Sequence, residues 1–198
     1  DYILANPPFN LSDWNDGSLN DDKRWKYGLP PSGNANFAWL QHMIKSMNPK
    51  TGRCAVVLPQ GVLFRSGKEG EIRKHLVESD KLEAIITMAS GVFYSTGVSA
   101  CILFLNNNKS PEHRGRICMI DGSGIYTPQR AQNIMTEDDI QTVYNLYTAY
   151  EDVIEKVKIV TIPEIKEKDS RRRKIVDARY LVHWSSANVS RNPMAAKR

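Results

Sequence analysis

The chain has 198 residues, of which 41% are hydrophobic and 25% charged, and its formal net charge is +5. This balance is usual for a globular domain, and the mild basic excess is compatible with nucleic-acid binding. No apolar run reaches membrane-spanning length and no signal peptide opens the chain, so we expect no membrane partner. The cysteines lack a CxxC pair and metal-ligand spacing, which predicts buried reduced thiols, a cytoplasmic location and no metal site.

The first expected element is a buried strand at residues 2–5 that runs directly into Asn6-Pro7-Pro8-Phe9. Two successive prolines can neither continue a strand ladder nor lie inside a helix, so the strand must end in a rigid turn. The polar stretch 10–36 that follows is rich in Gly and Pro and is too long for an ordinary connection. It is expected to be a functional loop, a segment ordered by a partner, or both.

Strands and helices then alternate along the chain. A helix is expected at 37–47, capped by Asn34 or Asn36 and ended by Pro49. The further elements expected are a strand at 53–58, a helix at 67–79 and strands at 82–88 and 98–105. This order predicts an α/β fold with a mostly parallel sheet covered on both faces. The last two strands have no helix between them and should pair antiparallel.

After Pro111 one more strand is expected at 116–121, followed by a helix that starts at Thr136. The apolar stripe of this helix should face the core and contains Ile140, Val143, Tyr144, Tyr147, Tyr150, Val153 and Ile154. The charged run 164–174 is expected to be a solvated face or a linker, with DNA contact by its basic end as the alternative. The sequence thus divides into a domain at 1–125, a mainly helical tail with a charged linker at 126–184, and a disordered end at 185–198.

The turn at residues 6–9 is the candidate catalytic feature of the sequence. Ligands of open α/β sheets bind outside the carboxyl ends of parallel strands, where this turn is expected to lie. The Asn6 side-chain oxygen and a carbonyl of the proline pair are two rigid acceptors that suit a planar amino group, and Phe9 can stack on the ring that carries it. Two acceptors would free the amine lone pair for transfer by positioning and electrostatics alone. A base in a duplex would have to be flipped out to reach the turn. The alternative is a stiff loop without chemistry.

The stretch DYILANPPF resembles the catalytic motif of amino-group methyltransferases that use S-adenosylmethionine. GRCAVVLPQGVLFRSGKEGEIRKHLVE and SGVFYSTGVSACILFL are similar to the modification (M) subunit of type I restriction-modification systems, an N6-adenine DNA methyltransferase family. The resemblance covers about residues 1–125. It implies a partial Rossmann-like methyltransferase fold, S-adenosylmethionine as cofactor, and DNA with the specificity (S) and restriction (R) subunits as partners.

The resemblance also assigns roles to the turn. Asn6 and Pro7 would hold the N6 amine of adenine, Pro8 would stiffen the turn, Phe9 would stack on the base, and Asn6 would also lie near the methyl donor. Loops at 59–61 and 91–93 would border the same cleft, although no chemical role for them follows from their residues. For Phe64, Phe93 and Phe104 we expect ordinary core packing.

One part of the family pattern is missing from the sequence. The family places its methyl-donor site N-terminal to the catalytic turn, on a strand followed by a glycine-rich loop, and neither is found here. We therefore expect residues 1–125 to be the C-terminal half of the catalytic domain and this stretch alone to be inactive. The first strand should then form an open edge beside exposed apolar helix surface, through which the chain would self-associate.

The loop after the turn holds Lys23, Arg24, Trp25 and Lys26, which interleave phosphate-binding and base-stacking side chains and are candidates for DNA contact. Two other functional interpretations stay open. One is a methyltransferase acting on a protein glutamine or an RNA base amine, and the other is a non-catalytic assembly module.

Overall fold

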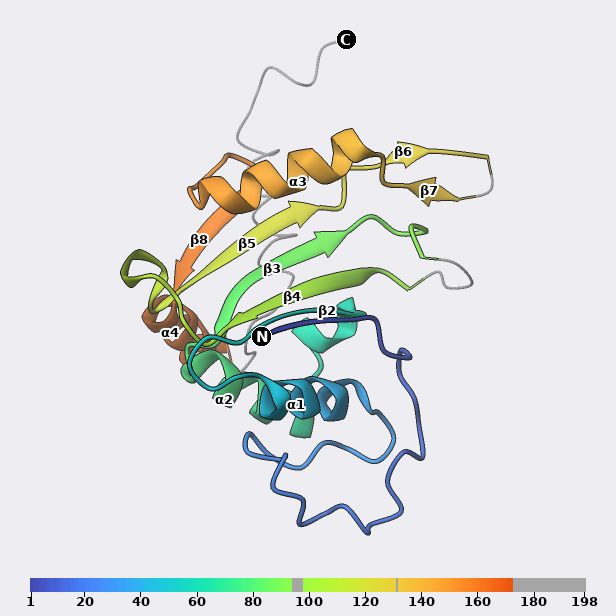
Figure 1. Cartoon of the computed structure of the whole chain (residues 1–198), viewed down its shortest axis with the longest axis vertical. Helices are drawn as coiled ribbons and strands as arrows, with labels where there is room; N and C mark the ends of the chain where they lie inside the picture. Colours follow the sequence, from blue (N-terminus) through green and yellow to red (C-terminus); the bar gives the residue numbers. More distant parts are fainter. Residues whose placement is uncertain (94–97, 131, 173–198) are drawn as a thin grey trace.

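The computed structural model describes residues 1–93, 98–130 and 132–172, so the expected disordered end at 185–198 lies outside the described residues. Its main feature is a six-stranded sheet with the strand order β1-β2-β4-β3-β5-β8 (Figure 1). The strands of this sheet are β1 (Tyr2–Ala5), β2 (Arg53–Pro59), β3 (Leu82–Met88), β4 (Ala100–Asn106), β5 (Arg116–Gly122) and β8 (Val157–Thr161). A separate small hairpin pairs β6 (Thr127–Pro128) with β7 (Asn133–Ile134).

The helices are α1 (Asn36–Ser46), α2 (Lys68–Glu78), α3 (Glu137–Ala149) and α4 (Ile162–Arg172), with short 3-10 turns η1 (Gln60–Leu63) and η2 (Pro111–His113). The α/β class and the strands and helices expected up to residue 121 are confirmed, with ends shifted by one or two residues. The predicted cap of α1 is different: Ala35 is the N-cap residue, and Asn34 Oδ1 accepts the backbone N–H of Asn36 at 3.0 Å.

The sheet is mixed. β1 pairs with β2, and β3 with β5, in parallel. β4 lies between β2 and β3 and is antiparallel to both, as the missing helix between β3 and β4 predicts. β8 is antiparallel to β5. Consequently β1, β2, β3 and β5 all run in one direction, and their carboxyl ends meet at one edge of the sheet (Figure 1).

Helices cover both faces of the sheet. On one face, Leu40 of α1, Leu76 of α2 and Ile165 of α4 pack into a core that includes Val56 and Leu58 of β2. On the opposite face, α3 covers β3, β5 and β8 (Figure 1). Every residue of β3 is buried, because both faces of this central strand are covered.

The apolar stripe of α3 is narrower than the sequence predicts. Val143 is buried, and Tyr147 packs with it against the sheet. In contrast Ile140, Tyr144 and Ile154 are exposed, so the expectation that they face the core was wrong. Ile140 and Tyr144 lie on the flank of the helix, and a helix resting on a sheet buries only the stripe that faces it. The start of α3 is as expected, since Thr136 and Asp139 form a reciprocal capping box.

The C-terminal part of the described chain differs from the expected helical tail. β8 is a strand of the main sheet that the sequence analysis did not predict. The run expected as a solvated face or linker forms α4 as far as Arg172, with Ile165 buried against the core. Residues 173 and 174, the end of the basic run, lie outside the described residues.

β1 forms one edge of the described sheet. Its Ile3 and Ala5 pack against the core, whereas Tyr2 and Leu4 are 78% and 83% exposed. The open edge is therefore as predicted. The prediction that exposed apolar surface beside this edge belongs to helices was wrong, because the large apolar residues of α1 and α2 are at least partly buried. The exposed apolar side chains belong to β1 itself.

Cys54, Cys101 and Cys118 are free and buried, as expected. Burial disfavours the thiolate and raises the pKa of Cys54 to about 11, so its thiol stays protonated and unreactive. Among the described helices, none is long and apolar enough to cross a membrane.

Candidate catalytic turn and substrate edge

Three turns follow the carboxyl ends of strands that run in the same direction. β1 leads into Asn6–Phe9, β2 leads into η1, and β3 leads into residues 89–93. They therefore lie along one edge of the sheet (Figure 1), where open α/β sheets bind ligands. The loops at 59–61 and 91–93 are thus found at the same edge as the proline turn, as their family likeness suggests.

The turn presents its polar group to solvent. Asn6 and Pro8 are exposed, while Pro7 and Phe9 are half-buried. The Asn6 carboxamide has no hydrogen-bond partner among the described residues. An amide that the protein leaves uncommitted at the end of a strand is available to a ligand.

Phe9 meets a second aromatic ring. Its centroid lies 6.2 Å from that of Phe93, and the two ring planes make an angle of 65°, which is an edge-to-face contact. Phe93 also packs against the core, as does Phe104, so the expected core packing of these two rings is confirmed. Phe64 is 47% exposed, so the same expectation was wrong for it. The sequence analysis did not count Phe93 as a site residue, and only the family likeness of residues 91–93 pointed to it.

The four residues predicted to contact DNA divide into two pairs. Arg24 forms two hydrogen bonds to Asp22, from Nε to Oδ1 at 2.9 Å and from Nη2 to Oδ2 at 2.7 Å. The Arg24 guanidinium accordingly lowers the pKa of Asp22 to about 2. The Trp25 indole donates to the Leu19 carbonyl at 2.6 Å. Arg24 and Trp25 are thus engaged within the loop, whereas Lys23 and Lys26 are exposed.

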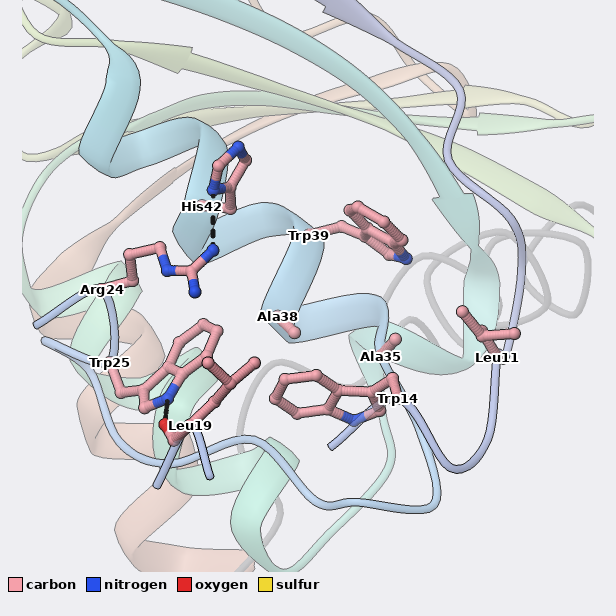
Figure 2. A pocket seen from close by; sticks show the side chains of 9 residues that line it. All are labelled: Leu11, Trp14, Leu19, Arg24, Trp25, Ala35, Ala38, Trp39 and His42. Carbon is pink, nitrogen blue, oxygen red and sulfur yellow. Dashed lines mark hydrogen bonds between the residues drawn. The ribbon is translucent and has the colours of Figure 1, made fainter. Parts of the chain in front are cut away.

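The long loop after the turn and α1 together line a pocket with three indole rings (Figure 2). Trp14 and Trp25 of the loop lie edge to face at 5.5 Å between centroids, and Trp39 comes from α1. Together with apolar side chains, Arg24 and His42 they line a pocket of about 300 Å³. Leu11, which follows Phe9 by two residues, is one of the residues that line the pocket. Gln41 of α1 holds the loop, since its Oε1 accepts the Tyr27 N–H at 2.9 Å and its Nε2 donates to the Gly28 carbonyl at 2.8 Å.

No group of three or more His, Cys, Asp or Glu side chains that could hold a metal ion occurs in the described residues. The chemistry that the site offers is hydrogen bonding and stacking: a free carboxamide, the carbonyl groups of a proline pair and two aromatic rings. These groups are complementary to a planar amino-bearing ring, the kind of group on which amino-group methyltransferases act.

Comparison with known proteins agrees with this class. Residues 1–177 match the family model of N-6 DNA methylases, and the chain belongs to this family. The match extends past the 125 or so residues that carry the resemblance in the sequence. Within the family, the resemblance to M subunits of type I systems is confirmed by the relatives that the chain matches.

The chain is 41% identical over 177 residues to the type I restriction enzyme HindI methylase subunit of Haemophilus influenzae, an alignment that covers 85% of this chain and 39% of the relative. It is 36% identical over 180 residues to the MjaVII methylase subunit of Methanocaldococcus jannaschii, covering 85% of this chain and 31% of that protein.

Among solved structures, the methyltransferase subunit of a type I restriction-modification system from Streptococcus thermophilus superimposes with a TM-score of 0.78 at 32% identity. That superposition covers 85% of this chain and 36% of the other. This chain therefore spans less than two-fifths of the length of these three relatives.

Proposed function

We propose that this chain is part of the catalytic region of a type I M subunit, and that the complete protein transfers a methyl group from S-adenosylmethionine to the N6 amine of a flipped adenine. The observation that carries the proposal is the exposed, uncommitted carboxamide of Asn6 at the carboxyl end of β1, beside the Phe9 ring. The relatives support it, since each is a methylase or methyltransferase subunit of a type I system.

The proposed roles follow from donor and acceptor chemistry. The two N–H groups of the adenine amine donate to Asn6 Oδ1 and to the Pro7 carbonyl, while Phe9 stacks on the base. Pro8 keeps the turn rigid, so little entropy is lost when the amine binds. With both hydrogens held, the nitrogen lone pair is directed away from the ring system and toward the methyl carbon.

S-adenosylmethionine, when bound, supplies an activated methyl group. The amine nitrogen would then form the new bond to the methyl carbon, the sulfur would keep the electron pair of the broken sulfur–carbon bond, and one N–H proton would pass to solvent water. Asn6 is the residue of this chain that we place on the donor side of the reaction. We assign no covalent enzyme intermediate, because positioning and electrostatic stabilisation are sufficient for this transfer.

For DNA, we propose that Lys23 and Lys26 contact backbone phosphates, whereas Arg24 and Trp25 hold the loop in shape. The exposure of the two lysines and the internal bonds of the other pair support this division. The complete protein would act with an S subunit that reads the DNA sequence and an R subunit that cuts, in the cytoplasm.

The proposal is tested by Asn6→Ala in the complete protein assembled with its S subunit. Loss of one acceptor that acts in the transition state should lower methylation by about 10²- to 10³-fold without preventing assembly. Asn145→Ala, on the exposed side of α3, is the matched control and should be without effect. Unchanged methylation by Asn6→Ala would overturn the role of the turn. Mass spectrometry of nucleosides and peptides from the same reactions separates DNA adenine from RNA-base or protein-glutamine substrates.

A further inference from the structure

We propose that Asn10 and Arg65 form a bridge that positions the Asn6–Phe9 turn against the turn after β2, and that Gly61 provides the space the bridge requires. Asn10 and Arg65 are positioning residues in this proposal, since they act on the adenine only through the turn. The inference rests on the proposed function, because the turn that is positioned is the proposed amine-holding site.

Asn10 follows Phe9 directly and is fixed by four hydrogen bonds. Its side-chain oxygen accepts from Asn34 Nδ2 at 3.1 Å, from Asn36 Nδ2 at 3.1 Å and from Arg65 Nη1 at 3.0 Å. Its backbone N–H donates to Asn36 Oδ1 at 3.0 Å. The backbone φ of Asn10 is 53°, a left-handed conformation that asparagine tolerates better than most residues. Residue type and conformation therefore both suit a fixed pivot at the end of the turn.

Two of these partners connect the turn to α1. Asn36 is the first residue of α1 and is fully buried, so it is a rigid anchor. The backbone N–H of Ala35, the residue before it, donates to the Leu11 carbonyl at 2.9 Å. The chain immediately after Phe9 is thus bound to the start of α1 through both side chains and backbone.

The third partner, Arg65, comes from the segment after η1, 55 residues along the chain from Asn10. The backbone carbonyl of Arg65 accepts from Arg73 Nη1 at 2.9 Å, and Arg73 is a buried residue of α2. Arg65 Nη1 lies 3.8 Å from Glu69 Oε1, which is beyond hydrogen-bond distance. The bridge therefore extends from α2 through Arg65 to Asn10.

Gly61 makes room for the guanidinium. A Cβ at this position would lie 3.0 Å from Arg65 Nε and 3.2 Å from Arg65 Cζ. Its φ is not in the left-handed region, so the requirement for glycine here is spatial and not conformational. This gives a physical reason for the glycine of Pro59-Gln60-Gly61, a stretch for which the sequence alone suggested no chemistry.

The bridge matters because the pairing of β1 stops before the turn. β1 pairs with β2 through Tyr2 to Ala5, and its ladder ends where the turn begins. The position of Asn6 relative to the rest of the edge therefore depends on contacts made after the turn. A displacement of about 1 Å can lower a rate by about 10²-fold, so such contacts affect catalysis directly.

The first experiment compares Asn10→Asp with Asn10→Gly in the complete protein assembled with its S subunit. Aspartate retains the side-chain oxygen that accepts all three hydrogen bonds, and both residues tolerate a φ of 53°. We expect Asn10→Asp to keep kcat for DNA methylation within about threefold, and Asn10→Gly to lower kcat about tenfold or more with little change in KM for DNA. Equal kcat values for the two variants would overturn the bridge, as would a change confined to KM.

The second experiment examines Gly61 and Arg65 together. Gly61→Ala and Arg65→Met should each lower kcat, and the double variant should be no worse than Arg65→Met alone, because Gly61 acts only through Arg65. Gly33→Ala is the control, since a Cβ there meets no atom within 4 Å. Additive effects in the double variant would contradict the proposal.

Amide hydrogen exchange at residues 9–11 separates failure of the bridge from failure of the proposed function. Exchange there should become at least tenfold faster in Arg65→Met than in Gly33→Ala, whichever substrate the protein methylates. If Asn6→Ala keeps full activity while this exchange increases, the proposed function fails and the bridge stands. Unchanged exchange, with Asn6→Ala inactive, overturns the bridge alone.

Discussion

Replacing Phe93 by alanine should weaken methylation through Phe9. The two rings meet edge to face at 6.2 Å, and this contact restricts the orientation of the ring on which the adenine is proposed to stack. An aromatic pair of this geometry contributes about 0.5–1.5 kcal/mol beyond the area it buries. If that free energy is lost at the stacking step, kcat/KM should fall about 2- to 12-fold, because about 1.36 kcal/mol corresponds to a factor of ten.

The assay is kcat/KM for methylation by the complete protein with its S subunit, together with the fluorescence of 2-aminopurine at the target adenine, which reports unstacking of the base. Phe93 is half-buried, so truncation should cost less stability than the roughly 3–5 kcal/mol of a fully buried phenylalanine. Urea unfolding identifies conditions under which the variant remains folded.

Two controls accompany this variant. Phe93→Tyr retains the ring edge and should stay within about twofold of the parent, because its aromatic contact is preserved. Tyr144→Ala removes an exposed ring on α3 and should have no effect. The reasoning is refuted if Phe93→Ala keeps the parental kcat/KM while Phe9→Ala loses activity, since Phe9 would then act without its partner.

Three further predictions concern other parts of the structure. Lys23 and Lys26 should be changed together to glutamine, and DNA affinity measured by fluorescence anisotropy at several salt concentrations. The slope of log affinity against log salt concentration should become less steep by about 1–2, and an unchanged slope would exclude phosphate contact. Asp80→Ala should destabilise the fold more than Lys109→Met in urea unfolding. The Lys109 side chain is 3% exposed and would lose its counter-ion, keeping only its bond to the Arg116 carbonyl at 2.9 Å, at a cost of about 3–5 kcal/mol. The Asp80 side chain is 32% exposed and keeps its bond from the Gly115 N–H, so the opposite order would contradict the interpretation. Leu4→Lys should reduce self-association of this chain through the β1 edge, and equal masses of variant and parent by light scattering at high concentration would argue against that interface.

The sequence by itself determined the local elements and predicted a chemistry for the turn. Apolar runs and turn residues located the strands up to residue 121, since these patterns reflect burial and backbone geometry that act over a few residues. The proline pair was enough to predict a rigid turn after β1, and the Thr136 cap was enough to predict the start of α3. The sequence-based predictions failed where the pattern of apolar residues was short or misleading. β8 has only five residues and lies inside a charged region, and the flank of α3 is apolar although it faces solvent.

Only the tertiary structure decided which residues surround the turn. Phe93 reaches Phe9 and Arg65 reaches Asn10 because β1, β2 and β3 end at the same edge of the sheet. In the long loop, the tertiary structure removed a candidate instead of adding one. The sequence suggested that Arg24 contacts DNA, but its side chain is bonded to Asp22. Periodicity and propensity describe a residue and its near neighbours in the chain. They carry no information about contacts between segments brought together by strand order, and those contacts determine which side chains are left free to bind a substrate.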